Sequence, residues 1–178
     1  MAQVSPDALG RARRLRLMVF DVDGVLTDGQ LWYGPQGEML KAFHVRDGHG
    51  LKLLAEGGVA TAVLSARSSQ ALAARAADLG LAHVLQGVTD KRPAFEALLA
   101  QLGLAAHEAG FMGDDLPDLP VLTHCGFACA PRGAHELALR QAHYVPDAPA
   151  GAGAAREVCE YVLGAQGRLE ELLARYRA

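Results

Sequence analysis

Polar side chains follow four separate apolar runs of this 178-residue sequence, at the point where each run ends. They are Asp21 and Asp23, then Ser65, then Lys91, then Asp114 and Asp115. Clustered carboxylates repel one another unless a hard cation such as Mg²⁺ neutralises them. A lysine and a hydroxyl at the same point supply the donors that a phosphoryl group needs, and an aspartate can attack phosphorus. These residue types therefore indicate Mg²⁺-dependent phosphoryl transfer through an aspartyl-phosphate.

A parallel sheet would bring these distant groups together, because the carboxyl ends of its strands meet at one edge. Apolar runs that read as buried strands alternate with helical stretches, which favours an α/β fold with a doubly wound, Rossmann-like parallel sheet. We expect strands at 17–20, 59–64, 82–85, 109–112, 127–130 and 144–145. We expect the longer helices at 47–56, 68–79, 93–102, 134–141 and 154–176.

Residues 30–43 interrupt this alternation and are typical of a β-hairpin. Strands at 31–33 and 39–43 flank a Gly-Pro-Gln-Gly turn, and the hairpin carries Trp32. An apolar two-stranded ribbon is barely stable alone and exposes its edges. We therefore expect another subunit to cover it.

The bulk properties fit one globular domain spanning residues 1–178. A formal net charge of -3 gives no electrostatic case for binding nucleic acid. No apolar run is long enough to cross a membrane, and the first residues lack the apolar segment of a secretory signal. Three cysteines are too few for a disulfide framework, so we expect reduced thiols and a cytoplasmic protein.

The motifs also carry a family resemblance. The stretch Asp-Val-Asp-Gly-Val-Leu-Thr at 21–27, with Ser65, Lys91 and Gly-Asp-Asp at 113–115, resembles the four motifs of the haloacid dehalogenase (HAD) superfamily of phosphohydrolases. Residues 21–29, 43–50 and 155–159 together look like the 3-deoxy-D-manno-octulosonate 8-phosphate (KDO 8-phosphate) phosphatases of lipopolysaccharide synthesis. That resemblance implies a capless homotetramer in which the hairpin builds the interface. It also implies that the tail, about 146–178, can reach a neighbour's active site.

The resemblance implies a role for each motif residue. Asp21 would be the nucleophile, and Asp23 would be the general acid and then the general base, with its backbone carbonyl on Mg²⁺. Asp21 and Asp114 would be the carboxylate ligands of the metal. Ser65 and Lys91 would hold the transferring phosphoryl group.

Further residues would contact the substrate. Asp115 would lie near the metal, through water. Arg46 and Arg67 are candidates for the carboxylate of the sugar acid, because a planar guanidinium suits that group. Arg156 is the candidate from the tail.

The sequence departs from the family pattern around the substrate. Ala66 replaces a glycine, His44 and His49 stand where asparagine and tyrosine are common, and the tail lacks a doubled glycine. A nine-carbon sugar acid phosphate therefore remains an alternative substrate. Asp118 could shape a turn or belong to the site, and Asp47 is more typical of a helix cap.

Two functions of other classes remain to be weighed. A signalling receiver domain also forms an aspartyl-phosphate beside Mg²⁺, but its phosphoacceptor ends a strand separate from its acidic pair. Here the run 59–64 ends in Ser65, and the spacing of Asp21 and Asp23 suits a nucleophile and an acid/base. A non-catalytic assembly domain would not need every catalytic group.

Overall fold

The computed structural model describes residues 2–177 and is built on one seven-stranded sheet. Its spatial order is β1-β9-β8-β7-β2-β5-β6, and only β1 runs antiparallel to its neighbour. The strands are β1 (Gln3–Val4), β2 (Leu17–Phe20), β5 (Ala60–Leu64), β6 (His83–Leu85), β7 (Ala109–Met112), β8 (Phe127–Cys129) and β9 (Tyr144–Val145). The predicted doubly wound α/β fold is confirmed, with β1 as a strand that the sequence did not predict.

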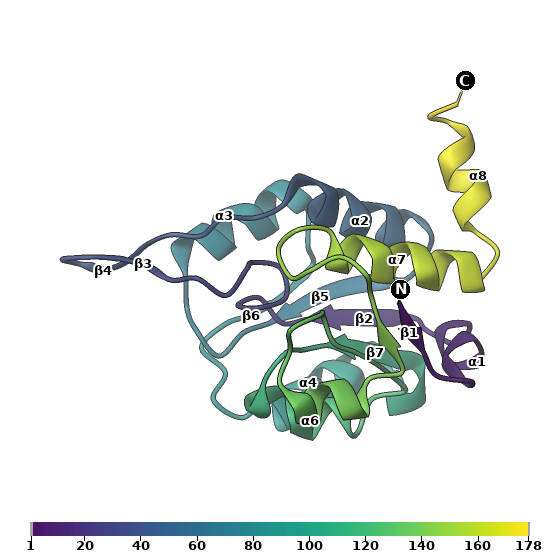
Figure 1. The fold of residues 1–178 in the computed structure, drawn as a ribbon, viewed down its shortest axis with the longest axis horizontal. Coiled ribbons are helices and arrows are strands. Elements are labelled where there is room, and N and C mark those ends of the chain that lie inside the picture. The colour runs from purple at the N-terminus through teal and green to yellow at the C-terminus, as the bar shows by residue number, and fades with distance from the viewer. Residues whose placement is uncertain (1, 178) are drawn as a thin grey trace.

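Helices cover both faces of this sheet (Figure 1). One face carries α1 (Ala8–Ala12), α2 (Val45–Glu56), α3 (Gln70–Leu79) and α7 (Ala154–Ala165). The other face carries α4 (Lys91–Leu102), α5 (Leu119–Leu122) and α6 (Glu136–Gln141). Strand β2 serves both cores, because Phe20 packs into the first and Val19 into the second. No helix within residues 2–177 is long and apolar enough to cross a membrane.

The register of the three central strands aligns the ends that carry the polar groups. Phe20, the last residue of β2, lies opposite Val63 of β5 and Met112 of β7. The chain leaves β2 at Asp21 and β5 at Ser65, and it reaches Asp114 two residues after β7. These side chains are therefore delivered to one edge of the sheet.

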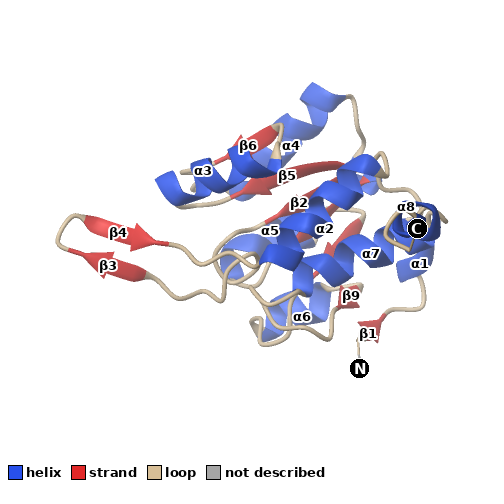
Figure 2. Ribbon diagram, turned by 90° about the horizontal axis from the view of Figure 1, so that it is seen from above, coloured by secondary structure: helices blue, strands red, loops and turns tan. Residues whose placement is uncertain are grey.

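The predicted hairpin is present as β3 (Trp32–Gly34) and β4 (Gly37–Leu40), with shorter strands than expected. It projects away from the rest of the fold (Figures 1 and 2). Trp32 is 56% exposed and Met39 is 64% exposed, and Tyr33 and Leu40 are equally open. Residues 41–43 lie outside the strand and lead the chain back to α2.

The C-terminal helix predicted over 154–176 is two helices, α7 and α8 (Leu169–Ala174). Gly167 separates them with a φ of +70°, a left-handed conformation that ends α7. The apolar positions continue across this break, so periodicity alone did not reveal it.

Asp47 caps a helix, as expected, but not the helix that contains it. Helix α2 begins at Val45, and the buried Asp47 carboxylate accepts the backbone N–H groups of Gly153 and Arg156 at 3.1 and 2.9 Å. It therefore holds the start of α7 against α2. Helix α4 likewise begins two residues earlier than expected, at Lys91.

The three cysteines are free and buried, in agreement with the expected reduced thiols. Cys125 precedes β8 and Cys129 ends it.

Candidate active site

A cleft of about 460 Å³ opens at the carboxyl ends of β2, β5 and β7. Seven of the predicted site residues line it, namely Asp21, Asp23, Ser65, Arg67, Lys91, Asp114 and Asp115. Pro117 and Asp118 complete the wall beyond Asp115. The convergence expected from the strand order is thus present within one chain.

A buried lysine joins two carboxylates at the floor of the cleft. Lys91 Nζ donates to Asp21 Oδ1 at 2.7 Å and to Asp118 Oδ1 at 2.6 Å. All three side chains are nearly inaccessible to solvent. Burial alone would lower the pKa of Lys91, but the two carboxylates outweigh burial and raise it, so the ammonium stays charged.

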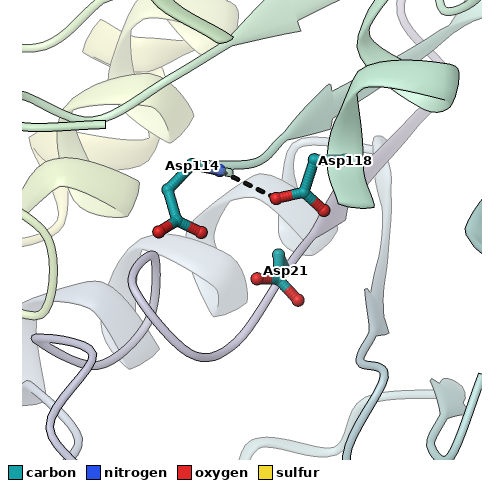
Figure 3. A group of neighbouring side chains, drawn as sticks. All are labelled: Asp21, Asp114 and Asp118. Carbon is teal, nitrogen blue, oxygen red and sulfur yellow. Dashed lines mark hydrogen bonds between the residues drawn. The ribbon is translucent and has the colours of Figure 1, made fainter. Parts of the chain in front are cut away.

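Asp21, Asp114 and Asp118 face one another, and oxygens of the three lie within 4.8 Å of each other (Figure 3). Burial and the charge of Asp118 raise the pKa of Asp21 to about 6. Burial and the charges of Asp21, Asp118 and Asp115 raise the pKa of Asp114 to about 7. A group of hard oxygen donors with excess negative charge fits Mg²⁺, because a divalent cation would offset both effects.

Asp118 holds the loop after β7 as well as Lys91. Its Oδ2 accepts the backbone N–H groups of Asp114 and Asp115 at 2.9 and 3.2 Å. Gly113 makes room for this arrangement, because a Cβ there would lie 2.5 Å from the Asp118 carboxyl carbon. Asp118 therefore both shapes a turn and belongs to the cluster, and its oxygens already have protein donors. Asp21 and Asp114 are left as the better cation ligands.

Gly24 lets the first loop approach Asp114. Its φ is +87°, and a Cβ at this position would lie 2.1 Å from Asp114 Oδ2. A larger residue would displace the carboxylate that faces Asp21.

Ser65 and Arg67 also line the cleft, in the loop that follows β5. The buried Ser65 Oγ accepts the Arg67 backbone N–H at 3.2 Å. The Arg67 guanidinium lies 3.4 Å from Glu38 and 4.0 Å from Asp23, and it donates to the Tyr33 hydroxyl. Arg67 therefore connects the cleft to the hairpin.

Asp23 has a partner that the sequence did not predict. Lys41, immediately after β4, donates its Nζ to Asp23 Oδ1, and it lies 3.2 Å from Glu38. A charged residue in an apolar ribbon was the signal available in the sequence, but the sequence could not show which residue Lys41 faces.

Arg46 and Arg156 are not among the residues that line the cleft. Arg46 is exposed and donates to the Ala152 carbonyl at 3.4 Å. Arg156 Nε donates to Glu160 at 2.7 Å, and its Nη1 lies 2.9 Å from His49 Nδ1. These two predicted substrate contacts are therefore not brought to the cleft of their own chain.

No family model matches the chain. It is 44% identical over 167 residues to 3-deoxy-D-manno-octulosonate 8-phosphate phosphatase KdsC of Yersinia pestis, covering 94% of this chain and 89% of the relative. The same-named protein of Escherichia coli K12 is 42% identical, with the same coverage. The Moraxella catarrhalis phosphatase, solved with magnesium, phosphate and KDO, superposes with a TM-score of 0.93 at 36% identity, over 96% of this chain and 98% of that one. These similarities confirm the predicted family, and the chain belongs to the 3-deoxy-D-manno-octulosonate 8-phosphate phosphatases.

Proposed function

We propose that this protein is a Mg²⁺-dependent phosphomonoesterase that hydrolyses KDO 8-phosphate to KDO and phosphate. The observation that carries the proposal is the Asp21–Lys91 pair at the floor of the cleft. Asp23, two residues after Asp21, lines the same cleft. The names of the relatives specify the substrate, and the Moraxella complex holds the product sugar acid and phosphate in that protein.

Asp21 is the nucleophile in this proposal. Lys91 occupies Oδ1 of its carboxylate and leaves the other oxygen to attack phosphorus. The phosphorus–oxygen ester bond breaks as the aspartyl-phosphate forms, and Asp23 gives its proton to the departing alkoxide. Asp23 then takes a proton from water, which attacks phosphorus and regenerates the Asp21 carboxylate.

The remaining residues hold the phosphoryl group. Ser65 Oγ accepts the Arg67 N–H, so its own proton can be donated to a phosphoryl oxygen. Lys91 supplies positive charge at the same place. When bound by Asp21, Asp114 and the Asp23 carbonyl, Mg²⁺ would neutralise charge on the phosphoryl oxygens.

Substrate choice rests on the residues around the mouth of the cleft. Arg67 lines it and presents a guanidinium that suits the carboxylate of a sugar acid. Arg46 and Arg156 lie outside the cleft of their own chain, so we infer that they act on substrate only through a neighbouring subunit.

The apolar hairpin supports a homo-oligomer, which we propose is a tetramer. Trp32, Tyr33, Met39 and Leu40 present a surface that a second copy of the chain would bury. We also propose that the reaction takes place in the cytoplasm, within lipopolysaccharide precursor synthesis.

The test is a steady-state comparison of KDO 8-phosphate with a nine-carbon sugar acid 9-phosphate, each with Mg²⁺ and with excess chelator. We expect Mg²⁺-dependent phosphate release and a kcat/KM at least about tenfold higher for the eight-carbon substrate. A reversed preference would favour the nine-carbon alternative, and absence of hydrolysis of both would refute the proposed function.

A further inference from the structure

The Asp23 carboxylate contacts a lysine at the end of the hairpin, on the side away from the cleft. Lys41 Nζ bonds Asp23 Oδ1, and the Arg67 guanidinium lies 4.0 Å from Asp23 Oδ2. The two oxygens of this carboxylate therefore face two different cations. Its orientation is set by Lys41, directly after β4, and by Arg67 in the loop after β5.

Lys41 lies outside the substrate cleft. Its side chain is only 2% exposed, and neither Lys41 nor Glu38 is among the described residues that line the cleft. Asp23 itself lines the cleft. Lys41 is thus placed to act on Asp23 and not on a bound substrate.

Glu38 fixes Lys41 in turn. Its carboxylate lies 3.2 Å from Lys41 and 3.4 Å from Arg67. This pair of contacts joins strand β4 to both cations that face Asp23. A buried lysine with two carboxylate partners has little freedom to turn elsewhere.

We propose that Lys41, supported by Glu38, is a positioning residue that directs the Asp23 carboxyl group toward the leaving-group oxygen. This inference rests on the proposed function, in which Asp23 protonates that oxygen. Without Lys41, the Asp23 carboxyl group can turn away from the leaving group. Misplacing a catalytic group by about 1 Å costs on the order of 100-fold in rate.

The test compares phenyl phosphate with 4-nitrophenyl phosphate, which are similar in size but differ in leaving-group basicity. Departure of phenolate, the more basic leaving group, depends more on protonation by a general acid than departure of 4-nitrophenolate does. The measured quantity is kcat/KM, because it covers the steps up to departure of the leaving group and excludes hydrolysis of the aspartyl-phosphate. Lys41→Met should lower kcat/KM by about 30- to 100-fold for phenyl phosphate and by less than about threefold for 4-nitrophenyl phosphate. Lys52→Met, at an exposed lysine of α2, is the matched control and should change neither value.

Two further variants keep the test independent of folding defects. Glu38→Gln leaves Lys41 in place. It should lower kcat/KM more for phenyl phosphate than for 4-nitrophenyl phosphate, by smaller factors than Lys41→Met does. In an Asp23→Asn background, Lys41→Met should cause no further loss on either substrate, because the residue through which it acts is already gone.

Equal losses on both aryl phosphates, or a further loss in the Asp23→Asn background, would overturn the role of Lys41 while leaving the phosphatase proposal intact. Absence of hydrolysis by the wild-type protein on KDO 8-phosphate and both aryl phosphates would overturn both proposals.

Discussion

The cleft and the β3-β4 hairpin distribute charged and apolar side chains in opposite ways. In the cleft, carboxylates and a lysine are buried at the ends of the central strands. On the hairpin, Trp32 and its apolar neighbours are exposed to solvent. Each arrangement is unfavourable in an isolated chain, because burial penalises charge and water penalises apolar surface.

The difference indicates what each region could bind. The cleft has its protein groups in place within one chain and carries excess negative charge, which a bound cation would offset. The hairpin exposes Trp32, Met39 and Leu40 to solvent, and a second protein surface would bury them. Lys41 and Glu38 lie where the two regions meet.

The largest expected effect comes from Asp21→Asn. This variant tests whether the cleft can lose its activity while the hairpin still supports assembly. Loss of the attacking carboxylate should lower phosphate release from KDO 8-phosphate by at least about 1,000-fold. Light scattering should still show the wild-type oligomer. Asp28→Asn, on an exposed residue of the same loop, is the control and should keep its activity.

Lys91→Met tests how much the ion pairs of the cleft contribute to folding stability, and it leaves the hairpin unchanged. Removal of the shared cation leaves Asp21 and Asp118 buried without their partner, which should lower the free energy of unfolding by about 3 kcal/mol at pH 8. The loss should shrink at pH 5, below the Asp21 pKa of about 6, where this buried carboxylate takes up a proton. Urea unfolding at both pH values measures it, and an equal loss at both would contradict the role of the ion pair.

Trp32→Ser tests the hairpin alone. Because Trp32 is exposed in the single chain, the variant should fold normally, but assembly should weaken by about 2 kcal/mol. Sedimentation over a dilution series measures the change. Leu137→Ser, at a similarly exposed apolar residue of α6, is the control. A wild-type protein that is monomeric at micromolar concentration would refute the proposed interface.

The stability of the metal-free protein should also depend on pH. The pKa values of Asp21 and Asp114, about 6 and about 7, exceed the ordinary value of 3.8, so the folded state binds more protons than the unfolded state between these limits. Stability without metal should therefore fall as pH rises from about 4 to 7. Stabilisation by Mg²⁺ should grow over the same range. Melting temperatures with Mg²⁺ and with chelator test both trends, and a constant Mg²⁺ effect would contradict them.

The sequence predicted the strands and their polar ends because both depend on local composition. An apolar run followed by Asp21 or Ser65 indicates a buried strand that ends at a site, and parallel strand order brings such ends together. The hairpin was similarly visible, because Trp32 and the Gly-Pro-Gln-Gly turn are local signals.

Long-range partners could not be predicted in this way. Asp47 has the sequence context of a cap for α2, yet it caps α7, more than 100 positions later. The pairing of Lys41 with Asp23 likewise depends on how the hairpin returns to the sheet. A sequence pattern gives the residue type at each place, and packing decides which residue it faces.

Trapping the covalent intermediate shows whether Asp21 becomes phosphorylated during turnover. Protein mixed with KDO 8-phosphate and Mg²⁺ is quenched in acid within milliseconds and reduced with borohydride, which converts an aspartyl-phosphate to homoserine. Peptide mass spectrometry should find homoserine at position 21 and at no other aspartate. Homoserine at another position, or none while phosphate is being released, would refute Asp21 as the nucleophile.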